Sequence, residues 1–140
     1  MDNEASRVWF AAVEALVEGD IPALISMYAA RLVRDDRRQL GAPSVEDRKS
    51  AIASDMATLA SMRLVGWAGQ VLETRGDHLA LMAIEFVTEE NFVIPGLVVG
   101  ETDTDGCISR GVYFDSDDQD AALAELDHRS TLLEDDAPQK

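Results

Sequence analysis

The chain has 140 residues, of which 46% are hydrophobic and 28% charged, a size and composition that suit one globular domain. Its net charge of −15 opposes binding to nucleic acids and to anionic membrane surfaces, because both carry negative charge. No segment approaches the roughly 20 apolar residues of a membrane helix, and the acidic N-terminus does not resemble a signal peptide. The single cysteine, Cys107, cannot form an internal disulfide. We therefore expect a cytoplasmic protein with no nucleic-acid or membrane partner.

Helical periodicity predicts three helices in the first part of the chain. They span residues 5–18, 21–28 and 45–61. We expect Ser44 to cap the third helix, with Asp47 completing a capping box. Residues 30–38, between the second and third helices, are short and highly charged, which is typical of an edge strand.

After residue 62 the pattern changes to that of strands separated by turns. Four runs are predicted, at residues 63–73, 78–88, 91–100 and 106–114. Because short turns join consecutive strands, we expect an antiparallel meander. A short helix is predicted over 119–128, and the acidic segment 134–140 is expected to be a disordered tail. A single domain would then span residues 1–133.

The second of these strands is apolar on both faces. One face carries Leu79, Leu81, Ala83 and Val87, and the other carries Ala80, Met82, Ile84 and Phe86. Helices packed on one side of a sheet cover only one of these faces. A homodimer formed through the sheet would cover the other, whereas a strongly twisted sheet would bury both faces within one subunit. We expect the homodimer.

Three stretches carry a family resemblance, namely residues 33–38, 73–81 and 114–129. Together with the first helix, and in this order, they resemble the SnoaL-like domains of the nuclear transport factor 2-like superfamily. The resemblance is closest to actinobacterial domains found in regulatory and signalling proteins. It implies an α+β cone in which three N-terminal helices pack on a curved antiparallel sheet, followed by a short C-terminal helix. It also implies a pocket between sheet and helices, frequent dimerisation and no shared cofactor.

Candidate catalytic residues lie in two of the predicted strands. In the first strand, Asp35 and Arg37 share one face, while Asp36 and Arg38 share the other. A pair that points into the cone would supply a desolvated general base and an arginine that orients a polar substrate; otherwise these pairs are structural. Glu85 is the lone acid in an apolar run. It is a candidate base if its face lines the pocket, and a solvated carboxylate if it lies near the strand end.

Aromatic residues supply the candidate ligand contacts. Trp67, Phe86 and Tyr113 fall in predicted strands and either line a cavity or pack in the core. Tyr113 would also offer a hydroxyl group. The two histidines, His78 and His128, are not spaced as metal ligands, so we expect neither a metal nor another cofactor.

These patterns favour a non-enzymatic or regulatory module that dimerises and binds a small apolar or amphipathic molecule. This interpretation depends on the absence of a convincing acid–base set and on the kind of protein that the resemblance indicates. The alternative is a small cofactor-independent isomerase, cyclase or hydrolase that uses Asp35 or Asp36 with Arg37, Glu85 and Tyr113. The enzyme requires an acid, an arginine and Tyr113 to converge within hydrogen-bond reach in one enclosed cavity.

Overall fold

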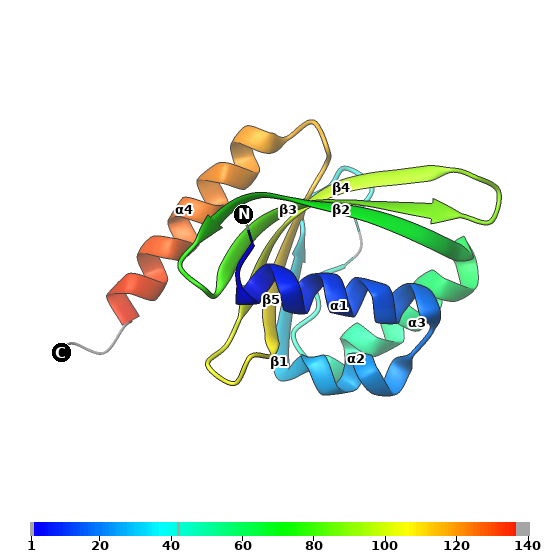
Figure 1. Cartoon of the computed structure of the whole chain (residues 1–140), viewed down its shortest axis with the longest axis horizontal. Helices are drawn as coiled ribbons and strands as arrows, with labels where there is room; N and C mark the ends of the chain where they lie inside the picture. Colours follow the sequence, from blue (N-terminus) through cyan, green and yellow to red (C-terminus); the bar gives the residue numbers. More distant parts are fainter. Residues whose placement is uncertain (1, 42, 137–140) are drawn as a thin grey trace.

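The computed structural model describes residues 2–41 and 43–136, which form one five-stranded sheet and four helices (Figure 1). In chain order the elements are α1 (Glu4–Glu18), α2 (Ile21–Met27), β1 (Tyr28–Asp36), α3 (Arg48–Met62), β2 (Leu64–Arg75), β3 (Leu79–Thr88), β4 (Val93–Thr102), β5 (Ile108–Phe114) and α4 (Gln119–Asp136). The α+β class is confirmed, and each predicted helix and strand is present. No helix in the described ranges is long and apolar enough to cross a membrane.

The sheet is mixed rather than wholly antiparallel. Its strand order is β1-β5-β4-β3-β2, and the four strands from β2 to β5 form the predicted antiparallel meander. The prediction of an edge strand at residues 30–38 is confirmed, because β1 lies at one end of the sheet. The expectation of a wholly antiparallel sheet was wrong, because β1 pairs with β5 in parallel. The chain leaves β1 through α3 and enters the meander at the opposite edge, so the last strand of the meander lies beside the first strand of the sheet.

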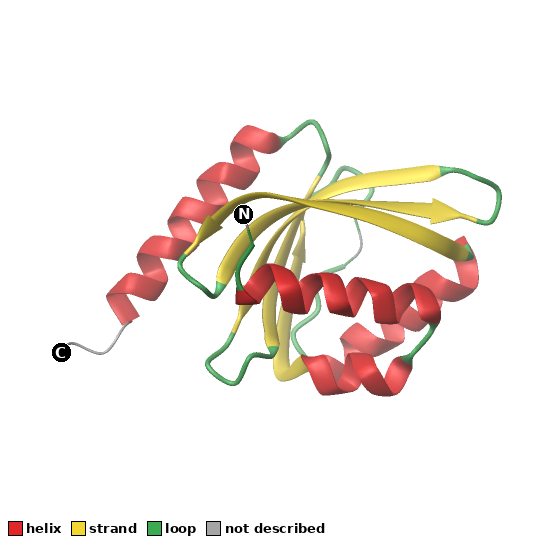
Figure 2. Ribbon diagram, viewed as in Figure 1, coloured by secondary structure: helices red, strands yellow, loops and turns green. Residues whose placement is uncertain are grey.

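Helices cover both faces of this sheet (Figure 2). The first three helices lie on one face, where α1 contributes Trp9 to the larger apolar core. The ring of Trp9 lies directly on the backbone of β4 and β5. A Cβ atom at Gly100 would come within 2.5 Å of Trp9 Nε1, and one at Gly111 within 2.6 Å of the same ring. Glycine at these two positions therefore lets α1 approach the sheet closely.

The C-terminal helix is long, with 18 residues, and the prediction of a short helix was wrong. Apolar spacing is weak after Leu126, which is why the pattern predicts an end near His128. Long-range contacts hold the further turns instead: Arg129 donates two hydrogen bonds to Glu101 on β4, at 2.9 and 3.0 Å. Residues 134–136 of the expected tail thus belong to the helix, and 137–140 lie outside the described residues.

The second apolar face of β3 is covered by α4 of the same chain. Leu79 and Leu81 are fully buried there, in a cluster with Ala122 and Leu126 of the helix. The homodimer was predicted because this face of β3 requires a cover. The long helix α4 supplies that cover over the half of β3 that contains Leu79 and Leu81. The homodimer itself stays a prediction.

The segment before α3 is extended rather than helical. Val45 exchanges two backbone hydrogen bonds with Arg34 of β1, at 2.8 and 3.1 Å, and so lies along the edge of the sheet. Asp47 is consequently the N-cap, and its carboxylate accepts a hydrogen bond from the Ser50 amide at 2.6 Å. The prediction of Ser44 as the cap was wrong because this bridge delays the start of the helix.

Candidate ligand-binding site

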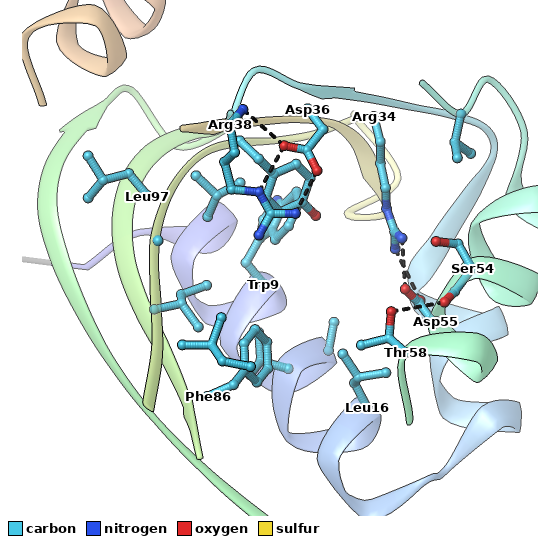
Figure 3. Close-up of a pocket in the computed structure, with 18 of the residues that line it drawn as sticks. Trp9, Leu16, Arg34, Asp36, Arg38, Ser54, Asp55, Thr58, Phe86 and Leu97 are labelled. Atoms are coloured by element: carbon cyan, nitrogen blue, oxygen red, sulfur yellow. Dashed lines mark hydrogen bonds and ion pairs between the residues drawn. The ribbon is translucent and has the colours of Figure 1, made fainter. Parts of the chain in front are cut away.

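A cavity of about 200 Å³ lies between the sheet and helices α1 and α3 (Figure 3). Apolar side chains from several elements form most of its walls: Val13, Leu16, Met62, Ile84, Phe86 and Ile94. The alternation of side chains along each strand explains which residues reach it. On β3 the even-numbered residues Ile84 and Phe86 line the cavity, and on β1 Arg34 and Asp36 do so.

Arg34 lies in a buried polar network that joins β1 to α3. Its guanidinium donates to both carboxylate oxygens of Asp55, at 2.7 and 3.1 Å, and to the Tyr28 hydroxyl at 2.9 Å. The Tyr28 hydroxyl in turn donates to Asp55 at 2.6 Å. Burial raises the pKa of Tyr28. Burial alone would lower the pKa of Arg34, but Tyr113 and Asp55 raise it by more, so the guanidinium stays charged.

A second ion pair on the cavity wall joins Asp36 to Arg38. Arg38 donates through Nε at 2.8 Å and through Nη2 at 2.5 Å, one bond to each carboxylate oxygen. Hydrogen bonding to Asp36 raises the pKa of Arg38. Because both arginines are matched by carboxylates, the polar part of the lining carries charges that compensate each other.

Tyr113 of β5 lies beside these pairs. The guanidinium carbon of Arg38 is 5.6 Å from the centre of its ring, and the Trp9 ring meets it edge-on at 6.3 Å. Burial raises the pKa of Tyr113, so its hydroxyl stays protonated at neutral pH. Unlike Tyr28, Tyr113 makes no hydrogen bond through its hydroxyl to any part of the chain that the structure describes. It is therefore a donor available to a molecule in the cavity.

Of the residues that the sequence indicated, Asp36, Phe86 and Tyr113 line the cavity. Asp35 and Arg37 lie on the opposite face of β1, as the alternation predicts. There Arg37 pairs with Asp35 at 2.9 Å and with Glu125 of α4 at 3.3 Å.

The structure also places Glu85 and Trp67 outside the cavity lining. Glu85 is exposed and lies on the face of β3 opposite Phe86. Trp67 stacks on Phe10 with ring centres 5.6 Å apart, and its Nε1 donates to Glu14.

Three site residues were not identified from the sequence, namely Tyr28, Arg34 and Asp55. Strand alternation could have indicated Arg34, since it shares a face with Asp36. Asp55 follows Ala51 by one helical turn and is only 5% exposed. An acidic residue on the face of a helix that is expected to be buried indicates a buried ion pair or hydrogen bond, because a buried carboxylate requires a partner.

The two carboxylates in the lining, Asp36 and Asp55, are each held by a bidentate arginine. Carboxylates, arginines and Tyr113 therefore line the same cavity. The carboxylate oxygens, however, already accept hydrogen bonds from the arginines, and Tyr113 hydrogen-bonds to neither carboxylate. Within the described ranges, no group of three or more His, Cys, Asp or Glu side chains is placed to hold a metal ion.

Solved structures with the same architecture define the fold. The Δ5-3-ketosteroid isomerase from Mycobacterium sp. is 13% identical, with a TM-score of 0.65 over 83% of this chain and 95% of that one. RV0760c from Mycobacterium tuberculosis, in complex with estradiol-17β-hemisuccinate, is 10% identical, with a TM-score of 0.59 over 80% and 93%. An NTF2-like protein of unknown function from Cytophaga hutchinsonii is 9% identical, with a TM-score of 0.61 over 81% and 90%.

The chain thus has the NTF2-like fold, which ketosteroid isomerases share. Neither a protein-family model nor a curated protein matches its sequence. At these identities the likeness concerns the fold alone.

Proposed function

We propose that this protein binds a small, largely apolar molecule of steroid-like shape in the cavity, with a polar group of the ligand directed to Tyr113. The observation that carries the proposal is an apolar cavity whose ion pairs are internally matched and whose wall includes the Tyr113 hydroxyl, which has no hydrogen-bond partner in the described part of the chain. Such a lining favours a neutral ligand with a single hydrogen-bonding end. Two proteins with this fold support the class of ligand, one a ketosteroid isomerase and the other a complex with an estradiol ester.

Binding without chemistry is the better supported form of this function. A general base must be able to accept a proton from the substrate. Asp36 and Asp55 instead accept two arginine hydrogen bonds each, and these bonds occupy their carboxylate oxygens. We also propose that the protein is a SnoaL-like module of the actinobacterial regulatory group and that it is located in the cytoplasm.

A cofactor-independent isomerase is the second candidate. Asp36, Arg38 and Tyr113 all line one cavity, and a protein of the same fold isomerises ketosteroids. This candidate requires Asp36 to separate from Arg38 when substrate binds. Incubation with a Δ5-3-ketosteroid decides between the two forms, because an isomerase would produce the ultraviolet absorbance of the conjugated enone, whereas a binding module would not.

Ligand titration tests the binding proposal. Isothermal titration calorimetry measures binding without a tryptophan reporter, and the neutral steroids progesterone and estradiol are suitable probes. Thr58→Trp places a large ring into the cavity from α3 and should abolish binding. The matched variant Ala57→Trp, at an exposed position of the same helix, should bind like the wild type. Failure of both probes to bind, or equal binding by Thr58→Trp, would contradict the proposal.

A further inference from the structure

The ring of Tyr113 is held in place by two side chains of the cavity wall. Trp9 meets it edge-on, with ring centres 6.3 Å apart, and the guanidinium carbon of Arg38 lies 5.6 Å from its centre. A charged guanidinium at this distance from an aromatic ring is attracted to it. Because both neighbours pack against the ring, the Tyr113 hydroxyl has a restricted position at the cavity wall.

Arg38 is itself fixed by Asp36 (Figure 3). Three groups of Arg38 donate to the Asp36 carboxylate: the backbone amide at 3.2 Å, Nε at 2.8 Å and Nη2 at 2.5 Å. The Arg37 amide donates to the Tyr113 carbonyl at 2.9 Å, which joins this part of the chain to β5. Gly41 packs against the same carboxylate, since a Cβ atom there would come within 2.7 Å of Asp36 Oδ1. The guanidinium therefore has one fixed place beside the Tyr113 ring.

The charges around Tyr113 act on its hydroxyl. Burial raises the pKa of Tyr113, and Asp55 and Asp36 act in the same direction, whereas Arg34 and Arg38 act to lower it. Within each ion pair the arginine has the larger effect. A nearby cation favours the phenolate and so makes the hydroxyl a stronger hydrogen-bond donor. Such an effect is larger between apolar walls than in water.

We propose that Arg38, held by Asp36, is a positioning residue that orients Tyr113 and strengthens the hydrogen bond donated by its hydroxyl to a ketone oxygen of the ligand. This inference rests on the proposed function. It gives the Asp36–Arg38 pair a role in ligand recognition that requires neither residue to touch the ketone. It also gives this pair a role other than acid–base chemistry.

The neighbouring arginine provides a matched control. The guanidinium carbon of Arg37 also lies 5.6 Å from the centre of an aromatic ring, that of Phe114, and Arg37 also pairs with an aspartate, Asp35. These residues lie on the opposite face of the sheet, where Phe114 belongs to the cluster under α4. Removing this second pair should therefore leave ligand recognition unchanged.

The test compares a 3-ketosteroid with its 3-deoxy analogue by isothermal titration calorimetry. Asp36→Asn/Arg38→Met removes both charges, because Arg38→Met alone would leave a buried carboxylate unpaired. We expect the preference for the ketone to fall from about tenfold in the wild type to about threefold or less, with the affinity for the deoxy analogue unchanged. Asp35→Asn/Arg37→Met should keep the full preference. Circular dichroism establishes that each variant is folded.

A double-mutant cycle separates positioning from direct contact. In a Tyr113→Phe background, Asp36→Asn/Arg38→Met should cause no further loss of the ketone preference, because Arg38 acts through the missing hydroxyl. The infrared stretching frequency of the bound ketone, read with an isotope-labelled carbonyl, gives a second signature. We expect it to be lower in the wild type than in Asp36→Asn/Arg38→Met, since a stronger hydrogen bond weakens the C=O bond.

A second variant disturbs the pair without changing a residue of the cavity lining. Gly41→Ala forces the Asp36 carboxylate to shift and should also reduce the ketone preference. At Gly66 the nearest atom to an added Cβ is 3.9 Å away, so Gly66→Ala should bind like the wild type.

The outcomes distinguish this inference from the proposed function. A ketone preference that Tyr113→Phe abolishes but Asp36→Asn/Arg38→Met retains, with an unchanged carbonyl frequency, would overturn the role of Arg38 and leave the proposed function intact. A further loss in the Tyr113→Phe background would overturn it in favour of direct contact between Arg38 and the ketone. A wild type without any ketone preference would overturn the proposed function, and this inference with it.

Discussion

Arg34 and Asp55 form a bidentate ion pair that fixes α3 against β1 at the wall of the cavity, with N–O distances of 2.7 and 3.1 Å. Both side chains are largely buried, at 15% and 8% exposure. Each charge is therefore tolerated only because the other is present. The pair shapes the cavity and also keeps its polar wall free of net charge.

Removing one partner of this pair should destabilise the protein strongly. Asp55→Ala leaves Arg34 charged and buried, and the expected loss in the free energy of unfolding is about 3–5 kcal/mol. Asp35→Ala breaks the more exposed pair with Arg37 and should cost less than about 1 kcal/mol. Urea denaturation measures both losses. Equal small losses would show that the buried pair has no special role.

The contact between α1 and the sheet predicts a difference between two glycines of β4. Gly100→Ala would force a methyl group to within 2.5 Å of Trp9 Nε1, and such overpacking costs about 1–3 kcal/mol. At Gly96 the nearest atom to the added Cβ is 3.7 Å away, so Gly96→Ala should be nearly neutral. Thermal unfolding of the two variants compares them directly. A neutral Gly100→Ala would contradict the close packing of Trp9.

The cover that α4 provides can be tested by truncating its side chains. Leu126 is fully buried against the outer face of the sheet, so Leu126→Ala should cost about 2–5 kcal/mol. Leu132 lies on the same helix but is 36% exposed, and Leu132→Ala should cost clearly less. Denaturant unfolding distinguishes the two variants. Similar losses for both would indicate that α4 does not pack on the sheet as described.

Both tyrosines of the chain line the cavity, which predicts an unusual alkaline titration. Burial raises the pKa of Tyr28 and of Tyr113 above the ordinary value of 10.0. The unfolded chain would lose these protons near pH 10 while the folded chain keeps them, so the free energy of unfolding should fall as the pH rises above 10. Phenolate absorbance of the folded protein should therefore not increase near pH 10. A tyrosine that ionises there would place its hydroxyl in water.

The element pattern could be predicted from the sequence because helices and meander strands depend on local periodicity. The parallel pairing of β1 with β5 could not, since it depends on where the chain crosses the sheet. The full length of α4 was missed because Arg129 stabilises it through Glu101, a contact that is remote in sequence.

The residues of the cavity could likewise be predicted only in part, where local alternation determines them. The alternation of side chains along the first strand correctly places Asp36 and Arg38 on one face and Asp35 and Arg37 on the other. It cannot indicate which of these two faces borders the cavity. The Arg34–Asp55 pair joins two elements whose relative position is set only by the folded chain.

The central claim is that Tyr113 supplies the free hydrogen bond for a neutral apolar ligand. The most direct test is the dissociation constant of a 3-ketosteroid and of its 3-deoxy analogue, measured by isothermal titration calorimetry with the wild type and with Tyr113→Phe. We expect the wild type to bind the ketone about tenfold more tightly. Tyr113→Phe should lose this preference and bind the deoxy analogue as before. An unchanged preference in Tyr113→Phe, or no binding of either steroid by the wild type, would contradict the account.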